Sequence, residues 1–196
     1  MIDKQRADSL SDEQRLEALA ERLSDIITLL GEDPQRQGLL KTPLRSAKAL
    51  MYLTSGYRKD PSAVIRSAMF DHEGSQVVTV RDIEFYSLCE HHILPFFGKV
   101  SIAYIPDGKI VGLSKLARII DIFARRLQVQ ERLTAQICRY VMEALGAKGV
   151  LVKCTAEHLC MKMRGVEKQD SSTVTFDCLG TISIDAALRT QILSML

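Results

Sequence analysis

Apolar residues near the start of the chain recur at the spacing of an α-helix. Ser11 precedes this stretch, and Gln14 lies three residues further on, which is the arrangement of a capping box at a helix N-terminus. Gly31 follows the last periodic residue and is typical of a helix end. The apolar residues that share one helical face are Leu16, Leu19, Leu23, Ile26, Ile27 and Leu30. Residues 1–10 show no such period, and we expect them to form a mobile end.

A second helix is predicted where Thr42 offers an N-cap and Pro43 occupies the first helical position. A short helix is expected after Pro61. Beyond residue 74 the period changes, and the pattern predicts strands at 77–86, 99–105, 149–155 and 172–179. Helical spacing returns at 113–123, 133–145 and 185–196.

The order of these elements predicts the fold class. Asp107-Gly108 is a strong turn signal, which predicts that Ile110-Val111 pairs back on the preceding strand. Strand pairs on either side of a helix pair favour an α+β domain, with an antiparallel sheet covered on one face. We therefore divide the chain into an N-terminal helical extension, residues 1–74, and a sheet domain, residues 75–196.

Composition and charge exclude several classes of protein. The 196 residues include 26 Lys and Arg against 24 Asp and Glu, and a net charge of +2 gives no general affinity for nucleic acid. No apolar run approaches the roughly 20 residues that a membrane helix needs, so no membrane partner is expected. Acidic residues at the N-terminus argue against a secretory signal: Asp3, Asp8, Asp12 and Glu13. The odd count of 5 cysteines favours a reducing, cytoplasmic setting with thiols free to bind metal.

Two short clusters of Cys and His predict a metal site. The first is Cys89-Glu90-His91-His92, and the second is His158-Leu159-Cys160. Cys89 and His92 are three residues apart, so a turn brings both onto one face, and Cys160 is a candidate third ligand from the later strand. Two thiolates and one imidazole suit Zn²⁺ best, and three protein ligands leave a position for water, as in catalytic zinc sites.

The ligand count stays open at this point, because Cys154 or His158 is a possible fourth ligand of a structural site. In an extended strand His158 and Cys160 share a face, so His158 would stand beside the metal as a general acid or base. A histidine satisfied in the core is the plainer interpretation of any one of these residues. The remaining cysteines lie at apolar positions and are interpreted as small buried hydrophobes: Cys138, Cys154 and Cys178.

A cluster of cations predicts an anion site. Ser114 is expected to cap the helix that follows it, which places Lys115 and Arg118 in the first turn, where cations oppose the helix dipole. A bound phosphate would explain their placement, and Lys162 and Arg164 are expected to aim at the same place. A solvated charged face is the alternative.

The segment that separates the two central helices contains a carboxylate of interest. Glu131 lies at the start of a helix, where the dipole favours it whatever its role. A carboxylate there also matches the paired N–H donors of a guanine edge. Both interpretations stay open from the residues alone.

Four motifs together resemble the GTP cyclohydrolase I family, of the zinc-dependent type. They are Ser87-Leu-Cys-Glu-His-His92, Gly112-Leu-Ser-Lys-Leu-Ala-Arg118, Arg126-Leu-Gln-Val-Gln-Glu-Arg-Leu-Thr134 and His158-Leu-Cys-Met-Lys-Met-Arg-Gly165. The resemblance covers about residues 12 to 196 and includes Gly31-Glu-Asp-Pro34 and Thr42-Pro-Leu-Arg45. It implies a tunnelling fold as the catalytic domain, with two helices on one face of an antiparallel sheet. It also implies a homodecamer with active sites at subunit interfaces.

The resemblance further implies a reaction and its residues. GTP and water would give 7,8-dihydroneopterin triphosphate and formate, the first step of tetrahydrofolate and pterin biosynthesis. Zn²⁺ would be held by Cys89, His92 and Cys160. His91 and His158 would be the acid/base residues, and Ser114 would assist opening of the ribose. Gln130 and Glu131 would bind the guanine. The triphosphate would contact Lys115, Arg118, Arg164 and, from a neighbouring subunit, Arg45.

Three other hypotheses are weaker. A zinc deaminase of nucleobases requires a C-x-x-C pair that the sequence lacks. A structural zinc module would have four ligands and no GTP turnover. A tunnelling-fold relative acting on another pterin or a deazaguanine is disfavoured by the paired Cys-x-x-His and His-x-Cys motifs.

Overall fold

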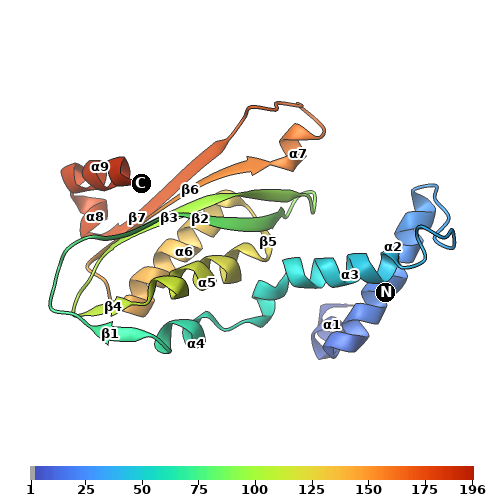
Figure 1. Ribbon diagram of the computed structural model, residues 1–196, viewed down its shortest axis with the longest axis horizontal. Coiled ribbons are helices and arrows are strands. Elements are labelled where there is room, and N and C mark those ends of the chain that lie inside the picture. Colours follow the sequence, from blue (N-terminus) through green and yellow to red (C-terminus); the bar gives the residue numbers. More distant parts are fainter. Residues whose placement is uncertain (1–2) are drawn as a thin grey trace. The chain divides into compact units, whose positions relative to one another are not determined.

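The computed structural model describes residues 3–196 and has α+β architecture (Figure 1). Residues 1 and 2 of the expected mobile end lie outside the described residues. The chain divides into two compact units, Met1–Thr54 and Ser55–Leu196. This division falls before the expected boundary at 74/75, because residues 55–74 pack within the second unit. The backbone N–H of Gly56, for example, donates to the carbonyl of Arg125 at 3.0 Å.

The N-terminal unit contains the helices α1 (Lys4–Ser9), α2 (Asp12–Leu29) and α3 (Thr42–Leu53). The capping box predicted at Ser11 is confirmed, since its hydroxyl accepts from the Gln14 N–H at 3.2 Å and the Gln14 side chain accepts in return at 3.0 Å. The helix α1 lies within residues 1–10, where the sequence shows no apolar period. Asp3 caps α1 by accepting from the Arg6 N–H at 2.7 Å, a local contact that needs no apolar period.

The second unit begins with a 3₁₀ turn (Ser55–Arg58), the predicted short helix α4 (Pro61–Arg66) and strand β1 (Met69–Asp71). β1 pairs antiparallel with β4 (Lys109–Val111) in a two-stranded sheet. The prediction that Ile110-Val111 pairs back on the preceding strand was therefore wrong. The turn at Asp107-Gly108 forms, but it leads the chain away to a strand that the sequence pattern did not reveal.

A five-stranded sheet forms the centre of this unit, with strand order β5-β2-β3-β6-β7. The strands span Val78–Cys89 (β2), Pro95–Ile105 (β3), Leu127–Gln128 (β5), Gly149–His158 (β6) and Thr173–Gly180 (β7). The four long strands are antiparallel, as predicted. The short β5 joins the edge of β2 in parallel, and it places Gln128 opposite Cys89.

Two long helices, α5 (Leu113–Ala124) and α6 (Gln130–Leu145), cover one face of the sheet (Figure 1). The main core lies between them and the strands, and includes Phe85, Phe96, Val100, Leu116 and Ile137. Apolar burial of this extent is the chief stabilising contribution of the fold. The expected α+β class, with two helices on one face of an antiparallel sheet, is confirmed.

A smaller core lies on the other face, because alternate residues of a strand point to opposite sides. Val150 and Val152 of β6 belong to the main core, whereas Leu151 packs with Ile182 and Ile192. The last two residues come from the short helix α8 (Thr181–Ile184) and from α9 (Ala186–Met195), the predicted terminal helix.

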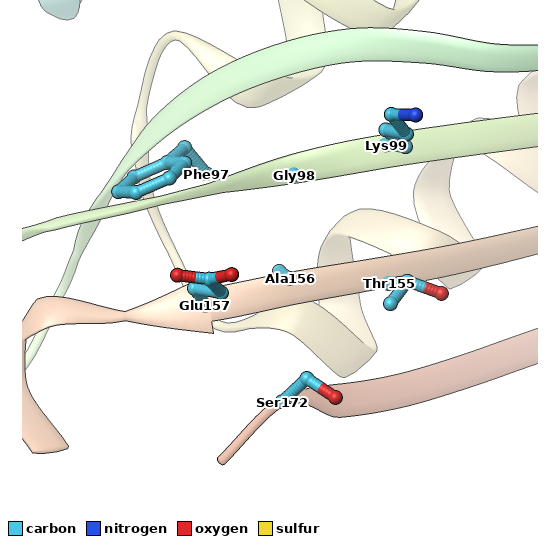
Figure 2. Close-up of a pocket in the computed structure, with 7 residues that line it drawn as sticks. All are labelled: Phe97, Gly98, Lys99, Thr155, Ala156, Glu157 and Ser172. Carbon is cyan, nitrogen blue, oxygen red and sulfur yellow. The ribbon is translucent and has the colours of Figure 1, made fainter. Parts of the chain in front are cut away.

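β3 and β6 approach closely beside a shallow hollow of about 200 Å³ (Figure 2). Gly98 makes this approach possible, since a Cβ there would lie 2.0 Å from the carbonyl oxygen of Thr155. The lining residues are Phe97, Gly98, Lys99, Thr155, Ala156, Glu157 and Ser172. These strands run on to the end of the sheet that carries Cys89 and His158, so their spacing helps to position those residues.

Candidate metal centre

A tight turn at the end of β2 positions the first two candidate ligands. The Cys89 carbonyl accepts from the backbone N–H groups of His92 at 3.3 Å and Ile93 at 2.8 Å, and the Cys89 N–H donates to Leu94 at 2.8 Å. Ile93 takes a positive φ of 55°, which reverses the chain toward β3. As the three-residue spacing predicted, the Sγ of Cys89 lies 3.7 Å from the Nδ1 of His92.

The third candidate ligand, Cys160, lies just beyond the end of β6. We expected an extended strand through His158 and Cys160, and this was wrong. The strand ends at His158, which pairs with Phe96 of β3, and the chain enters the single-turn helix α7 (Leu159–Lys162). The helical turn, rather than strand alternation, directs Cys160 to the turn that carries Cys89.

The donor set fits a soft divalent metal. The Sγ of Cys89, a ring nitrogen of His92 and the Sγ of Cys160 lie within 4.8 Å of one another. Tetrahedral zinc, with Zn–S of about 2.3 Å and Zn–N of about 2.0 Å, places S and N ligands about 3.5 Å apart. The observed 3.7 Å between Cys89 and His92 matches that geometry. Burial and the neighbouring Cys89 raise the pKa of the Cys160 thiol, and a metal ion must displace its proton to bind the sulfur.

The two residues considered as a fourth ligand have other environments. Within residues 3–196, the metal-capable group contains neither Cys154 nor His158. Burial raises the pKa of Cys154 to about 12, although hydrogen bonds with Thr134 and Thr175 oppose this shift. Such a thiol behaves as a buried apolar group. Cys138 is likewise fully buried, with a pKa raised by burial to about 12, whereas Cys178 is half-buried.

A cavity of about 230 Å³ opens beside the metal group. Its lining includes both histidines that flank the ligands and the start of α6: Cys89, His91, His92, Gln128, Val129, Gln130, Glu131, His158, Cys160, Met161 and Thr173. His91 is exposed, and its Nε2 lies 3.8 Å from the carboxylate of Glu90. Arg132 of α6 donates to that same carboxylate, which connects the ligand turn with the helix.

His158 is held more tightly than His91. Its ring stacks on Phe96 with centroids 4.7 Å apart and an interplanar angle of 2°. Its Nε2 lies 2.8 Å from the Oε1 of Gln130. Burial lowers the pKa of His158, and the nearby Glu131 carboxylate partly opposes this by favouring the charged ring.

The two predicted guanine-binding residues differ in their surroundings. Glu131 is exposed at the first turn of α6 and lines the cavity. Gln130 is buried, and its amide nitrogen donates to the carbonyls of Cys154 at 3.1 Å and Thr173 at 3.0 Å. The sequence offered no signal for these contacts, nor for the Phe96 stack, because both depend on how β3, β6 and β7 pair.

The cations predicted to form one anion cluster do not gather in a single chain. Gly112, not Ser114, is the N-cap of α5, so the predicted capping role of Ser114 was wrong. Ser114 and Arg118 are exposed, and the Lys115 ammonium donates to the hydroxyl of Ser67 at 2.8 Å. Glycine can begin the helix because its backbone adopts the required geometry without a side-chain cap.

The start of α5 lies far from the metal group. α5 has 12 residues and is therefore about 18 Å long. Its last turn leads into β5, where Gln128 pairs with Cys89, whereas its first turn follows β4 at the other end of the sheet (Figure 1). Lys115 and Arg118 thus belong to the opposite end from Cys160.

The remaining predicted cations lie on other elements. Lys162 forms an ion pair with Glu157 at 2.8 Å within the α7 region. Arg164 is exposed in the segment after α7, and Arg45 is exposed on α3 in the N-terminal unit. Lys162 and Arg164 were predicted to aim at the same place as Lys115, but within one chain α7 and the start of α5 lie at opposite ends of the sheet. Whether these cations meet across subunits stays a prediction.

The fold and the site together define a protein with a Cys₂His metal-capable group beside an α+β sheet. The GTP cyclohydrolase I family matches residues 19–196, so the chain belongs to this family. It is 51% identical to GTP cyclohydrolase 1 of Porphyromonas gingivalis over 187 residues, covering 95% of this chain and 96% of the relative. It is 58% identical to GTP cyclohydrolase 1 of Parabacteroides distasonis over 165 residues, covering 84% of each chain.

Two further findings concern structure. A crystal structure of the archaeosine synthase QueF-Like in the apo form aligns with a TM-score of 0.43 at 18% identity, covering 55% of this chain and 97% of that chain. Among the described residues, no helix combines the length and apolar character needed to cross a membrane.

Proposed function

We propose that this protein opens the purine ring of GTP at C8, releases formate, and forms 7,8-dihydroneopterin triphosphate. The main support is that Cys89, His92 and Cys160 converge at one cavity. His158 and Glu131 also line this cavity. Family membership supports the reaction. It would be the first step of tetrahydrofolate and pterin synthesis, in the reducing cytoplasm that the free thiols favour.

We propose Zn²⁺ as the metal, held by Cys89, His92 and Cys160. Two thiolates and an imidazole are donors that favour zinc over Mg²⁺ or Ca²⁺, which prefer oxygen. When bound with one open position, zinc supplies a nucleophile at neutral pH by lowering the pKa of water toward about 7. The three-member group in residues 3–196 is compatible with such an open position.

The two histidines beside the ligands are the proposed proton carriers. As water adds at C8, the purine N7 must gain a proton, which an adjacent imidazolium can donate. His91 and His158 both line the cavity, so either ring lies within the region where C8 and N7 would stand. The later opening and rearrangement of the ribose is also acid/base chemistry, for which Ser114 of another subunit is the proposed assistant.

Glu131 is the residue proposed to recognise guanine. Its exposed carboxylate, at the mouth of the cavity, can accept two hydrogen bonds from the N1–H and 2-amino group of guanine. Adenine lacks this pair of donors, and a buried mismatch of polar groups lowers specificity constants by orders of magnitude.

The triphosphate site is proposed to form between subunits of a homo-oligomer, with the decamer of the family as the expected assembly. Lys115 and Arg118 lie at the end of α5 remote from the metal group of their own chain. A triphosphate bound to a guanosine at Cys160 would therefore meet the Lys115 and Arg118 of a second copy. Arg164 and a neighbouring Arg45 would complete the cation set, by charge-assisted bonds to phosphate.

The test is incubation of the purified protein with GTP, followed by pterin absorbance and fluorescence and by formate, with and without a zinc chelator. We expect pterin and stoichiometric formate, both abolished by the chelator and restored by added Zn²⁺. Ammonia in place of formate would indicate a deaminase instead. No turnover by the zinc-loaded protein would refute the proposed function.

A further inference from the structure

Gln130 occupies an unusual position for a residue expected to bind substrate. It begins α6 and is only 1% exposed, although it borders the cavity. Its amide nitrogen donates to the carbonyls of Cys154 and Thr173 at 3.1 and 3.0 Å, and it also lies 3.3 Å from the hydroxyl of Thr175. The Thr175 hydroxyl lies 2.7 Å from that of the buried Thr134, which extends this polar network into the helix–sheet interface.

These partners determine which way the Gln130 amide is turned. Backbone carbonyls can only accept hydrogen bonds, so the group facing Cys154 and Thr173 must be the NH₂. The amide oxygen is then the atom that faces His158, with its Oε1 at 2.8 Å from Nε2. Because that oxygen can only accept, the Nε2 of His158 must carry hydrogen.

This assignment sets the chemistry of the ring. With Nε2–H committed to Gln130, Nδ1 is the nitrogen of His158 that can take up and release a proton. The parallel stack on Phe96, 4.7 Å between centroids, restricts the plane of the same ring. The stack on Phe96 thus limits the plane of the His158 ring, and the hydrogen bond to Gln130 limits rotation within that plane. Together the two contacts support a single ring orientation.

We propose that Gln130 is a positioning residue that holds His158 in the Nε2–H form and orients its Nδ1 for proton transfer, rather than a residue that binds guanine. This inference rests on the proposed function only for the identity of the reaction. Purine selection then falls to Glu131, the neighbouring residue with an exposed side chain. Positioning of this kind acts on the chemical step, because a misplaced proton carrier slows turnover without weakening ground-state binding.

The first experiment needs no turnover. The zinc-loaded protein is labelled with ¹⁵N-histidine, and the imidazole ¹⁵N resonances of His158 are assigned by their loss in His158→Ala. We expect hydrogen on the Nε2 of His158, as its contact with the Gln130 oxygen requires. A neutral ring with hydrogen on Nδ1 would overturn the proposal, even if the protein converts GTP normally.

The second experiment separates positioning from guanine binding. Gln130→Met removes the acceptor at similar size, and we expect kcat to fall by about 10- to 100-fold with little change in KM. The preference for GTP over inosine triphosphate, which lacks the 2-amino group, should stay as in the parent. In Glu131→Gln that preference should collapse. A raised KM and a lost GTP preference in Gln130→Met would overturn the proposal and restore a guanine-binding role.

Two further variants guard against a structural explanation. Gln130→Glu keeps the oxygen acceptor that faces His158 but loses the donor to the carbonyls of Cys154 and Thr173. It should therefore retain the Nε2–H signature and recover only part of the turnover lost in Gln130→Met. Gln136→Met removes a different glutamine of α6, which accepts from Gln128 at 2.9 Å, and should leave the His158 resonances unchanged. If Gln130→Glu loses the Nε2–H form while keeping its fold by circular dichroism, the proposal fails.

Discussion

The metal-binding end of the sheet and the N-terminal end of α5 carry the two halves of the predicted site, but they are built differently. At the metal end, backbone hydrogen bonds hold the turn from Cys89 to Leu94, while Phe96 and Gln130 hold His158. At the α5 end, Arg118 is exposed and Lys115 bonds the hydroxyl of Ser67.

The difference fits what each half is proposed to bind. A metal site requires ligand distances within about 0.2 Å, which a single chain achieves most readily with tightly bonded turns. Phosphate binding depends on charge and on flexible cationic side chains, so it tolerates groups that arrive from a neighbouring molecule. The metal end is therefore assembled within one chain, and the anion end is suited to an interface.

The largest effect is expected at the metal end. Cys160→Ala should abolish zinc binding and formate release, a fall of more than about a thousandfold, because the means of activating water is lost. Elemental analysis and a formate assay measure this. Cys178→Ala, a half-buried cysteine outside the metal group, is the matched control and should retain zinc. Full zinc content in Cys160→Ala would defeat the ligand assignment.

His158→Ala should keep its zinc but slow ring opening by about 10² to 10⁴-fold, the usual contribution of a positioned acid or base. Zinc content and single-turnover formate release distinguish this from metal loss. The control is His72→Ala, which removes the histidine outside both clusters. Unchanged turnover in His158→Ala would remove the residue from the mechanism.

Subunit mixing tests whether the two ends meet across copies. Lys115→Ala should lower kcat/KM by about 10- to 100-fold, since a desolvated phosphate contact of 1.5 to 3 kcal/mol is lost. Co-expression of Lys115→Ala with Cys160→Ala should produce hybrid oligomers in which about a quarter of the sites contain both native residues, if mixing is random. Activity no higher than the sum of the separate variants would place both residues in one subunit's site.

Gly98→Ala tests how far the metal end depends on sheet spacing. A Cβ at 2.0 Å from the Thr155 oxygen forces β3 and β6 apart, which should lower the free energy of unfolding by about 1–3 kcal/mol. At the other end, a Cβ on Gly112 would lie at an ordinary contact distance of 3.6 Å from the Cβ of Ala68. Gly112→Ala should therefore lower the free energy of unfolding by less than Gly98→Ala. Denaturant unfolding measures both, and the reverse ranking would contradict this account.

The smallest effect concerns α4, whose C-cap residue Ser67 contacts Lys115. Hydrogen bonds from Ser62 lower the pKa of Asp60. A lowered carboxyl pKa contributes stability above the pKa of the unfolded chain, and that stability is lost as the pH falls through the folded value. Ser62→Ala should therefore lower the melting temperature slightly at pH 7, and the two proteins should converge below about pH 3. A difference in melting temperature that is larger at acidic pH than at pH 7 would contradict this explanation.

Periodicity predicted most of the elements, because each depends on which residues nearby in sequence are apolar. The capping box at Ser11, the four long strands and the helices α5 and α6 all follow from such local patterns. The spacing of Cys89 and His92 likewise sets their approach, since both lie in one turn. The family resemblance rested on these same local motifs.

Tertiary structure alone decided what non-local pairing controls. β1 is three residues long and is stabilised by β4, some forty residues later, so no local period reveals it. Three further features depend on strand order. They are the turn into α7 that brings Cys160 to Cys89, the hydrogen bonds that hold the buried Gln130 beside His158, and the distance from Lys115 to the metal end. The sequence by itself thus determined the local elements and predicted which side chains carry the chemistry. Packing determined which of these side chains meet within one molecule, because long-range contacts leave no periodic pattern in the chain.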